Sequence, residues 1–179
     1  MRDLVIRLER RTDHDAVDAL HLAAFGAHGT RVVPLLHDLR AMRAAMSLVS
    51  ERDGAVAGHV LFSPAWLDAP QRLVQVAVLS PVAVLPRHQR RGVGSKLIRH
   101  GLKLLEDQGV PAVFLEGPPQ YYGPFSFEPA VVAGFRKPSL RIPDEAFQCV
   151  RMRWYQPSMT GTVVYSDVFW RHDAVGLRD

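Results

Sequence analysis

The sequence lacks several residues and segments that mark whole classes of protein. It contains one cysteine, Cys149, and no asparagine. A single cysteine cannot form an internal disulfide, and a chain without asparagine has no N-glycosylation acceptor. No apolar run is long enough to cross a bilayer, and residues 1–10 mix charged with apolar side chains rather than forming a signal peptide. We therefore expect a cytoplasmic protein without membrane contacts.

Acidic residues are missing from one long window. Between Asp68 and Glu106 there is no Asp or Glu but there are seven Lys or Arg residues, whereas the rest of the chain holds 15 basic and 18 acidic residues. The net charge of +4 therefore reflects one cationic segment. A basic balance permits nucleic acid, an acidic membrane or a phosphorylated ligand. Because the charge gathers around one predicted helix start, we expect phosphate groups of a small molecule and no nucleic acid.

What is present is the composition of an ordinary globular domain. The 179 residues are 47% hydrophobic and 22% charged, which excludes a disordered chain and supplies enough apolar surface for a core. The sequence has no internal repeat and no linker. We expect a single domain over residues 1–179.

Hydrophobic periodicity predicts the order of the elements. Strands are expected over 3–9, 47–50, 55–63, 73–85, 110–116, 148–154 and 162–169, and helices over 13–25, 32–46, 92–108 and, as a short piece, 120–125. The strand at 73–85 is nearly all apolar and should be central. Pro81 within it cannot donate to a sheet ladder and predicts a bulge or splayed pairing. This order indicates an α/β domain whose mostly antiparallel sheet carries one parallel crossover.

A glycine-rich turn after the central strand is the most informative motif. It reads Gln-Arg-Arg-Gly-Val-Gly-Ser over 89–95 and opens a helix. The first amides of a helix have no internal partners and lie at the positive end of its dipole, so they form an anion site. Gly92 and Gly94 let a ligand approach the backbone, and Arg90 and Arg91 add charge. The third glycine of a dinucleotide fingerprint and the Gly-Lys-Ser order of an ATPase phosphate loop are both missing.

With a second motif, this turn resembles the acetyl-CoA signature of the GNAT family of acyltransferases. The first part is the Gln-x-x-Gly-x-Gly pattern. The second is Tyr-Tyr-Gly-Pro-Phe-Ser-Phe-Glu-Pro-Ala over 121–130, which is similar to a later segment of one GNAT subgroup. One departure is Ser126, where the family usually has Gly and where a positive φ would strain Ser. The resemblance implies a GNAT fold: a mixed, mostly antiparallel twisted sheet with flanking helices and a splayed central strand.

The resemblance also implies how acetyl-CoA is bound. Backbone groups of Val82, Ala83 and Val84 would pair with the pantetheine arm like an added strand. Gln89 would shape the turn, and the amides after it would hold the pyrophosphate. These amides belong to Arg90, Arg91, Gly92, Val93, Gly94 and Ser95.

Two side chains have catalytic roles by the same resemblance. Tyr122 would protonate the leaving thiolate, which suits a phenol that is protonated at neutral pH; the alternative is a core aromatic. Glu116 is the only acid near the predicted site, because the strand at 73–85 contains none, and it would act as general base; it is equally well placed as a solvated residue at the sheet end. His28 and His59 are further candidates, although a lone histidine usually has a structural role.

The function implied is acetyl transfer from acetyl-CoA to a primary amine by direct attack, with no metal. A non-catalytic acyl-CoA-binding or sensing module stays open because the central strand lacks a carboxylate. A nucleic-acid-binding domain is suggested only by the basic charge. The acceptor, a small molecule or a protein, would be bound by residues 25–31 and segments beyond 128. Trp66 and Phe25 would line that pocket or, more simply, fill the core. An exposed strand near the C-terminus would be the place for a homodimer contact.

Overall fold

The structure is a computed structural model and describes residues 4–176. Contacts between Cα atoms divide the chain into two compact units that alternate along the sequence. Unit 1 comprises Met1–Ser63 and Ser80–Lys103, and unit 2 comprises Pro64–Leu79 and Leu104–Asp179. The single domain expected over residues 1–179 stays a prediction, and both ends of that range lie outside the described residues.

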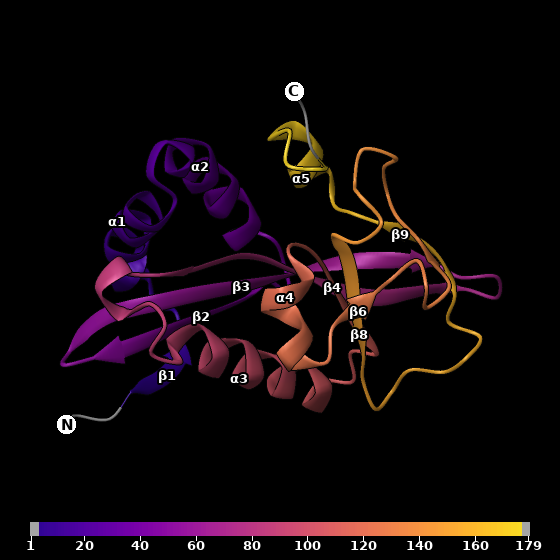
Figure 1. Ribbon diagram of the computed structural model, residues 1–179, viewed down its shortest axis with the longest axis horizontal. Helices are drawn as coiled ribbons and strands as arrows, with labels where there is room; N and C mark the ends of the chain where they lie inside the picture. Colours follow the sequence, from indigo (N-terminus) through magenta and orange to yellow (C-terminus); the bar gives the residue numbers. More distant parts are fainter. Residues whose placement is uncertain (1–3, 177–179) are drawn as a thin grey trace. The chain divides into compact units, whose positions relative to one another are not determined.

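The element order agrees with the α/β class expected from the sequence (Figure 1). The helices are α1 (His14–Phe25), α2 (Gly29–Arg40), α3 (Val93–Asp107), α4 (Pro119–Tyr122) and α5 (Asp167–Arg171). The strands are β1 (Val5–Leu8), β2 (Met46–Arg52), β3 (Ala55–Asp68), β4 (Leu73–Val84), β5 (Ala112–Glu116), β6 (Glu128–Pro129), β7 (Phe135–Arg136), β8 (Phe147–Arg151) and β9 (Gly161–Val164). The first predicted strand began at Asp3, which lies outside the described residues. Described helices are all too short or too polar to cross a membrane.

The strands form a mixed sheet in the order β1-β2-β3-β4-β5-β8-β6, with β9 paired to β3 and β7 paired to β9. The pairs β1–β2, β2–β3, β3–β9, β5–β8 and β6–β8 are antiparallel. β4 and β5 are parallel, as expected for the crossover through α3. The short pair β7–β9 is a second parallel pair, which the sequence did not indicate. The mostly antiparallel sheet is therefore confirmed.

In unit 1, β3 is covered on both faces (Figure 1). A Cβ on Gly58 would meet Val93 and Leu97 of α3, and Phe62 contacts Gly101 of the same helix. Side chains alternate along a strand, so His59 points to the opposite face, where it meets α1. The layers of unit 1 are thus α3, the strands, and then α1 with α2.

Alanine at Gly101 is expected to lower the free energy of unfolding by about 1–3 kcal/mol, the usual cost of overpacking a core. An added Cβ would lie 2.2 Å from the Phe62 ring, which is 1% exposed and cannot swing into solvent. Chemical denaturation of the variant measures the effect. The control is His100→Ala on the exposed side of α3, which should change stability by less than about 0.5 kcal/mol. Equal midpoints for the two variants would contradict the tight contact.

Two element boundaries differ from expectation for local reasons. The helix predicted over 32–46 runs from Gly29 to Arg40, because the chain then turns through Ala44 at φ 66, which a right-handed helix cannot accommodate. The strand predicted over 162–169 ends at Val164. Ser166 then takes an extended conformation at the N-cap of α5 and Asp167 places a negative charge in its first turn.

Candidate functional site

The turn between β4 and α3, in unit 1, has the form that the sequence predicts. After β4 the chain makes a short 3-10 turn over Pro86–His88. The side-chain amide of Gln89 then donates to the carbonyl of Val84 at 3.0 Å, which fastens the turn to the end of the strand. The N–H of Leu85 donates to Ala57 at 3.0 Å and joins the same strand end to β3. This bond holds the turn, and the role of Gln89 toward a ligand stays a prediction.

The backbone of this turn is left-handed at two places, Arg90 with φ 55 and Gly92 with φ 78. Both residues and Arg91 are exposed. α3 begins at Val93, and the N–H of Lys96 bonds the carbonyl of Gly92 at 3.0 Å. The amides of residues 93–95 thus lie before the first full turn of the helix, where backbone donors have no partner inside the helix. Together with the two arginines they make a cationic cradle at the positive end of the α3 dipole.

The pairing of β4 with β5 is short. β4 pairs with β5 at Ala77–Val113 and Val78–Phe114, whereas β8 pairs with the whole of β5 over Ala112–Glu116. In the described part of the chain, no pairing of β4 with β5 is assigned beyond Val78, although β4 continues to Val84. The Ser80–Pro81 peptide bond in this stretch is cis. Residues 82–84, expected to pair with the pantetheine arm, lie in this stretch of β4, and that role stays a prediction.

Tyr122 lies in unit 2 at the end of α4 and is 8% exposed. Its ring packs edge-on against Tyr121 at 4.8 Å and Phe127 at 5.8 Å, and it fills the space where Gly117 has no side chain. Burial raises the pKa of the Tyr122 phenol, and the neighbouring Tyr121 acts in the same direction. The hydroxyl is therefore a proton donor at any physiological pH. Aromatic packing and proton donation are both compatible with this position.

Ser126 follows this aromatic segment in a left-handed conformation. Its φ is 68 and its ψ is 18, the geometry in which the sequence expected strain for any residue other than glycine. The N–H of Ser126 bonds the carbonyl of Gly123 at 2.9 Å and closes the turn. The departure from the family pattern thus changes the residue type but not the turn.

Glu116 ends β5, also in unit 2, on the face of the strand opposite Tyr122. A Cβ on Gly117 would lie beside Leu115 and Tyr122, so the side chain of Glu116 points the other way. Its carboxylate accepts the N–H of Gly176 at 2.9 Å. Burial raises the pKa of Glu116, while this hydrogen bond and the nearby Tyr165 hydroxyl oppose the shift. A buried carboxyl with a raised pKa suits a general base, but its bond to Gly176 also gives it a structural task.

The other candidate residues of the sequence analysis differ in how exposed their side chains are. His28 is exposed, whereas His59 is fully buried and bonded to His21, a residue that the sequence analysis missed. The missed signal is a histidine within the apolar stripe of α1. Phe25 is half-buried, and Trp66 is 47% exposed, so the expectation of a core position for Trp66 is wrong.

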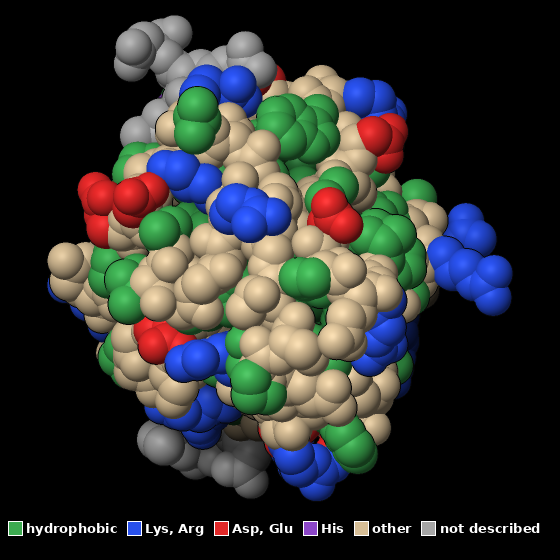
Figure 2. Space-filling view, turned by 90° about the vertical axis from the view of Figure 1, so that its right-hand side faces the viewer, with side chains coloured by type: hydrophobic (Ala, Val, Ile, Leu, Met, Phe, Trp, Pro, Cys, Tyr) green, Lys and Arg blue, Asp and Glu red, His purple; other side chains and the backbone are tan. Residues whose placement is uncertain are grey.

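Unit 2 has exposed apolar side chains, but those in the view of Figure 2 are scattered and do not form one large patch. On the face drawn in Figure 2, hydrophobic side chains stand as separate groups among charged ones of both signs. β9, the last strand described, is paired with β3 on one side and β7 on the other, so it is not an open edge. The homodimer contact expected near the C-terminus stays a prediction. Among residues 4–176, no group of three or more His, Cys, Asp or Glu side chains could hold a metal ion.

A family model described as an acetyltransferase (GNAT) domain matches residues 5–130. The chain belongs to the GNAT family. The matched region contains the turn after β4, both catalytic candidates and the histidine pair. The GNAT fold inferred from two short motifs is therefore confirmed by a match over most of the chain.

Relatives and solved structures agree with this GNAT assignment. The N-acetyltransferase YjhQ of Escherichia coli (strain K12) is 34% identical over 153 residues, covering 84% of this chain and 81% of that protein. The structure of the GNAT family N-acetyltransferase YhbS from Escherichia coli, in complex with CoA, aligns with a TM-score of 0.83 at 30% identity, over 98% of this chain and 96% of that one. A GNAT family acetyltransferase from Brucella melitensis, in complex with acetyl-CoA, aligns with a TM-score of 0.74 at 31% identity, over 94% and 99% of the two chains.

Proposed function

We propose that this chain transfers the acetyl group of acetyl-CoA to a primary amine by direct attack on the thioester. Membership of the GNAT family makes it an acetyl-CoA-dependent N-acetyltransferase. The observation that carries the proposal is the cationic cradle after β4, with its left-handed Arg90 and Gly92 and its helix-start amides. Two GNAT structures that align over nearly the whole chain bind CoA or acetyl-CoA. The three phosphates of CoA fit a site of this charge.

The donor would be held by backbone groups. Val82, Ala83 and Val84 would bond the pantetheine arm, because these residues lie beyond the part of β4 that pairs with β5. Gln89 keeps the turn in place, and the amides of residues 90–95 would bond the pyrophosphate oxygens. Arg90 and Arg91 would neutralise the charge that remains.

An ammonium acceptor loses two protons, one before attack and one as the amide forms, so the reaction needs two proton acceptors, one proton donor and one stabiliser of negative charge. The amine nitrogen attacks the carbonyl carbon, and the amide of Val82 would bond the oxyanion of the tetrahedral intermediate. As that intermediate collapses, the carbon–sulfur bond breaks and Tyr122 would give its proton to the leaving thiolate. Glu116 would accept one of these two protons from the acceptor. The pKa values of Tyr122 and Glu116, both raised by burial, support these two roles.

Alanine at Gly92 is expected to weaken acetyl-CoA binding by about tenfold or more, because the left-handed φ of 78 would cost alanine about 1–2 kcal/mol and re-aim the amides of the turn. Gly54 is a matched control. Its φ is 79, and a Cβ at either glycine would meet nothing within 4 Å. Both variants should lose similar stability, but G54A should bind normally. A titration of the thermal midpoint with acetyl-CoA measures both; equal affinity for the two variants would remove the turn from the binding site.

The deciding experiment for the whole proposal has two stages. Acetyl-CoA at about 100 times its dissociation constant should stabilise the folded protein by about 2.7 kcal/mol, and no shift at all would contradict a GNAT-type donor site. A screen of small amines, amino acids and lysine peptides with acetyl-CoA should then release free thiol for one class. Binding without thiol release for any class would favour the alternative, a non-catalytic acyl-CoA sensor.

A further inference from the structure

Unit 1 contains a chain of hydrogen bonds that joins two fully buried histidines to a carboxylate. Nε2 of His21 lies 2.9 Å from Nδ1 of His59, and Nε2 of His59 lies 2.8 Å from Oγ of Ser47. The Ser47 hydroxyl donates to Oε2 of Glu9 at 2.5 Å. Glu9 is held in turn by two bonds from the Arg40 guanidinium, at 3.0 and 2.8 Å. The chain therefore runs from α1 through β3 and β2 to the residue after β1.

Glu9, at the end of this chain of hydrogen bonds, determines which atom donates and which accepts in each of them. Glu9 in a two-bond pair with a guanidinium is a carboxylate, which only accepts hydrogen bonds. The Ser47 hydrogen therefore points to Glu9, and its oxygen must accept from Nε2 of His59. Burial lowers the pKa of His59 well below its ordinary value, so the ring is neutral and its Nδ1 is a bare acceptor. Nε2 of His21 must then carry a hydrogen.

The last member of the chain is left with an unused lone pair. Burial lowers the pKa of His21 to about 4, so this ring is also neutral at physiological pH, and with a hydrogen on Nε2 its Nδ1 is bare. His21 is 0% exposed, and its Nδ1 has no hydrogen-bond partner among residues 4–176. Buried nitrogens in proteins are normally paired. An unpaired acceptor at one end of a fully bonded chain is a place where a proton can enter.

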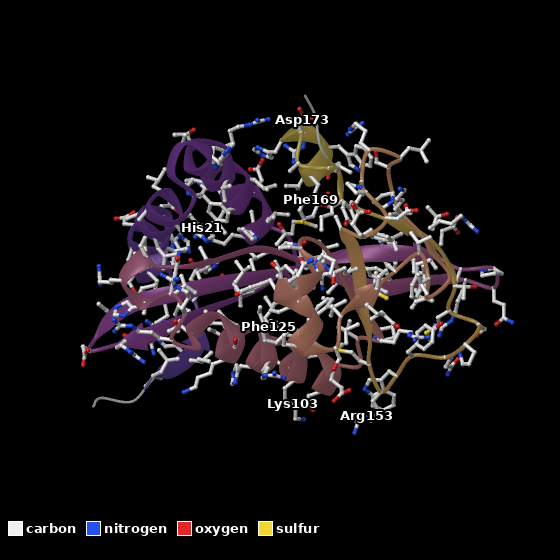
Figure 3. The ribbon with its side chains drawn as sticks, in the orientation of Figure 1. His21, Lys103, Phe125, Arg153, Phe169 and Asp173 are labelled. Atoms are coloured by element: carbon white, nitrogen blue, oxygen red, sulfur yellow. The ribbon has the colours of Figure 1, made fainter. Side chains whose placement is uncertain are left out.

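Nδ1 of His21 belongs to a ring that lies near two segments of unit 1, the one expected to bind the amine acceptor and the one proposed to bind the pantetheine arm. The His21 ring stacks on Phe25, with centroids 5.7 Å apart and planes at 4°, and Phe25 begins the segment expected to bind the acceptor. Figure 3 shows His21 on α1 above the strands. On β3, His59 is two residues from Ala57, whose carbonyl bonds Leu85 directly after the proposed pantetheine segment.

The charged groups around this chain of hydrogen bonds allow a proton to pass along it without leaving an unpaired charge behind. Arg40 lies 3.7 Å from Asp18 as well as beside Glu9, and His37 bonds Asp18 at 2.6 Å. Arg40 therefore keeps an anionic partner if Glu9 is neutralised. Arg40 disfavours, and Asp18 favours, a positive charge on His21 itself. These surroundings thus favour transfer of a proton through the two neutral rings and disfavour a protonated, positively charged form of either ring.

We propose that Nδ1 of His21 accepts the proton released by the acceptor ammonium across intervening water, and that the buried chain carries it to Glu9. As the proton arrives at Nδ1, the Nε2 hydrogen of His21 moves to His59, the Nε2 hydrogen of His59 moves to Ser47, and the Ser47 hydrogen moves to Glu9. The ammonium loses one proton, Glu9 gains one, and both rings stay neutral. After the acetylated product has left, the proton returns along the same bonds to Nδ1 of His21 and passes to water in the emptied acceptor site, which restores the chain. This proposal rests on the proposed amine acetylation.

The kinetic test is His21→Gln, assayed with methylamine and hydroxylamine at neutral pH. The glutamine amide can still donate to His59, so the fold keeps its bond, but it has no basic lone pair. Methylamine is an ammonium ion at this pH and hydroxylamine is uncharged. The variant should lower kcat/KM by about 10²-fold or more for methylamine and by less than about threefold for hydroxylamine. Ser47→Ala should act in the same direction, and His100→Gln, an exposed histidine on α3, should change neither rate.

Equal losses for both nucleophiles would mean a structural role and overturn the proposal, as would an unchanged methylamine rate. NMR of histidine labelled with ¹⁵N gives a readout that needs no acceptor. His21 and His59 should both be neutral with hydrogen on Nε2, and hydrogen on Nδ1 of His21 would overturn the proposal. A wild-type protein that binds acetyl-CoA but acetylates neither nucleophile would contradict the proposed amine transfer, and the NMR spectrum would still decide for or against the histidine chain.

Discussion

Replacing Tyr122 by phenylalanine is expected to lower turnover by about 10²-fold or more while acetyl-CoA affinity stays within about twofold of wild type. Phenylalanine keeps the ring that packs on Tyr121, Phe127 and the bare backbone of Gly117, so the fold should be unaffected. Only the proton donor is removed. Because burial raises the pKa of this phenol, the wild-type group is fully protonated, and the loss should be the same at every pH below about 9.

Tyr121→Phe is the matched control for this experiment. It removes a neighbouring phenol that is 44% exposed and stands edge-on to the Tyr122 ring. Thiol release under saturating acetyl-CoA and acceptor measures turnover, and the acetyl-CoA-dependent thermal shift measures affinity. Unchanged turnover in Y122F would identify Tyr122 as a core aromatic. A loss of affinity in step with turnover would make it a binding residue rather than an acid.

Acid is expected to destabilise the protein steeply between about pH 6.5 and pH 4. In the unfolded chain His21 takes up a proton near its ordinary pKa of 6.5, but in the folded protein it stays neutral until about pH 4. His59 behaves in the same way, with its pKa well below the ordinary value. The unfolded state therefore binds more protons in this window. Each histidine should cost about 1.4 kcal/mol of stability per pH unit, and their contribution is fully present only above the ordinary pKa.

Urea denaturation at a series of pH values tests this expectation. The free energy of unfolding should fall with a slope of about 2–3 kcal/mol per pH unit near pH 5, where both buried imidazoles contribute. In His21→Gln the slope should be roughly halved, because glutamine does not titrate, whereas His100→Gln on the exposed side of α3 should keep it. A stability that is flat from pH 7 to pH 4.5 would mean that the histidine pair can be protonated in the folded state.

Features that depend on neighbouring residues were predictable from the sequence. The turn after β4 and the helix that it opens lie where Gln89, Gly92 and the following residues predict them, although the pattern did not specify the bond from Gln89 or the left-handed φ angles. Ser126 has the positive φ that the sequence analysis named as the condition for strain at this position. Local rules suffice here because the partners lie within a few residues of each other.

Features that depend on distant residues were not predictable in this way. His21 and His59 are 38 positions apart, and nothing in the pattern of either segment says that the two rings meet. The exposure of Trp66 depends on which face of β3 is left uncovered beside β9. The bond from Gly176 to Glu116 joins residues 60 positions apart and gives the carboxylate a second task. Such pairs follow from the packing of whole elements, which hydrophobic periodicity does not specify.

Because β5 pairs with β8, the region that the family model matches does not fold independently of the segment that follows it. The matched region ends at residue 130, yet β5 bonds along its whole length to Phe147–Arg151. The ring of Phe114 at the middle of β5 packs against Phe135 and Phe147, both beyond that limit. A fragment cut at the end of the matched region would carry both sequence motifs described above and an unpaired, apolar strand edge. The segment beyond residue 130 is thus a structural support for the matched region, and any exchange of it between relatives must keep this strand.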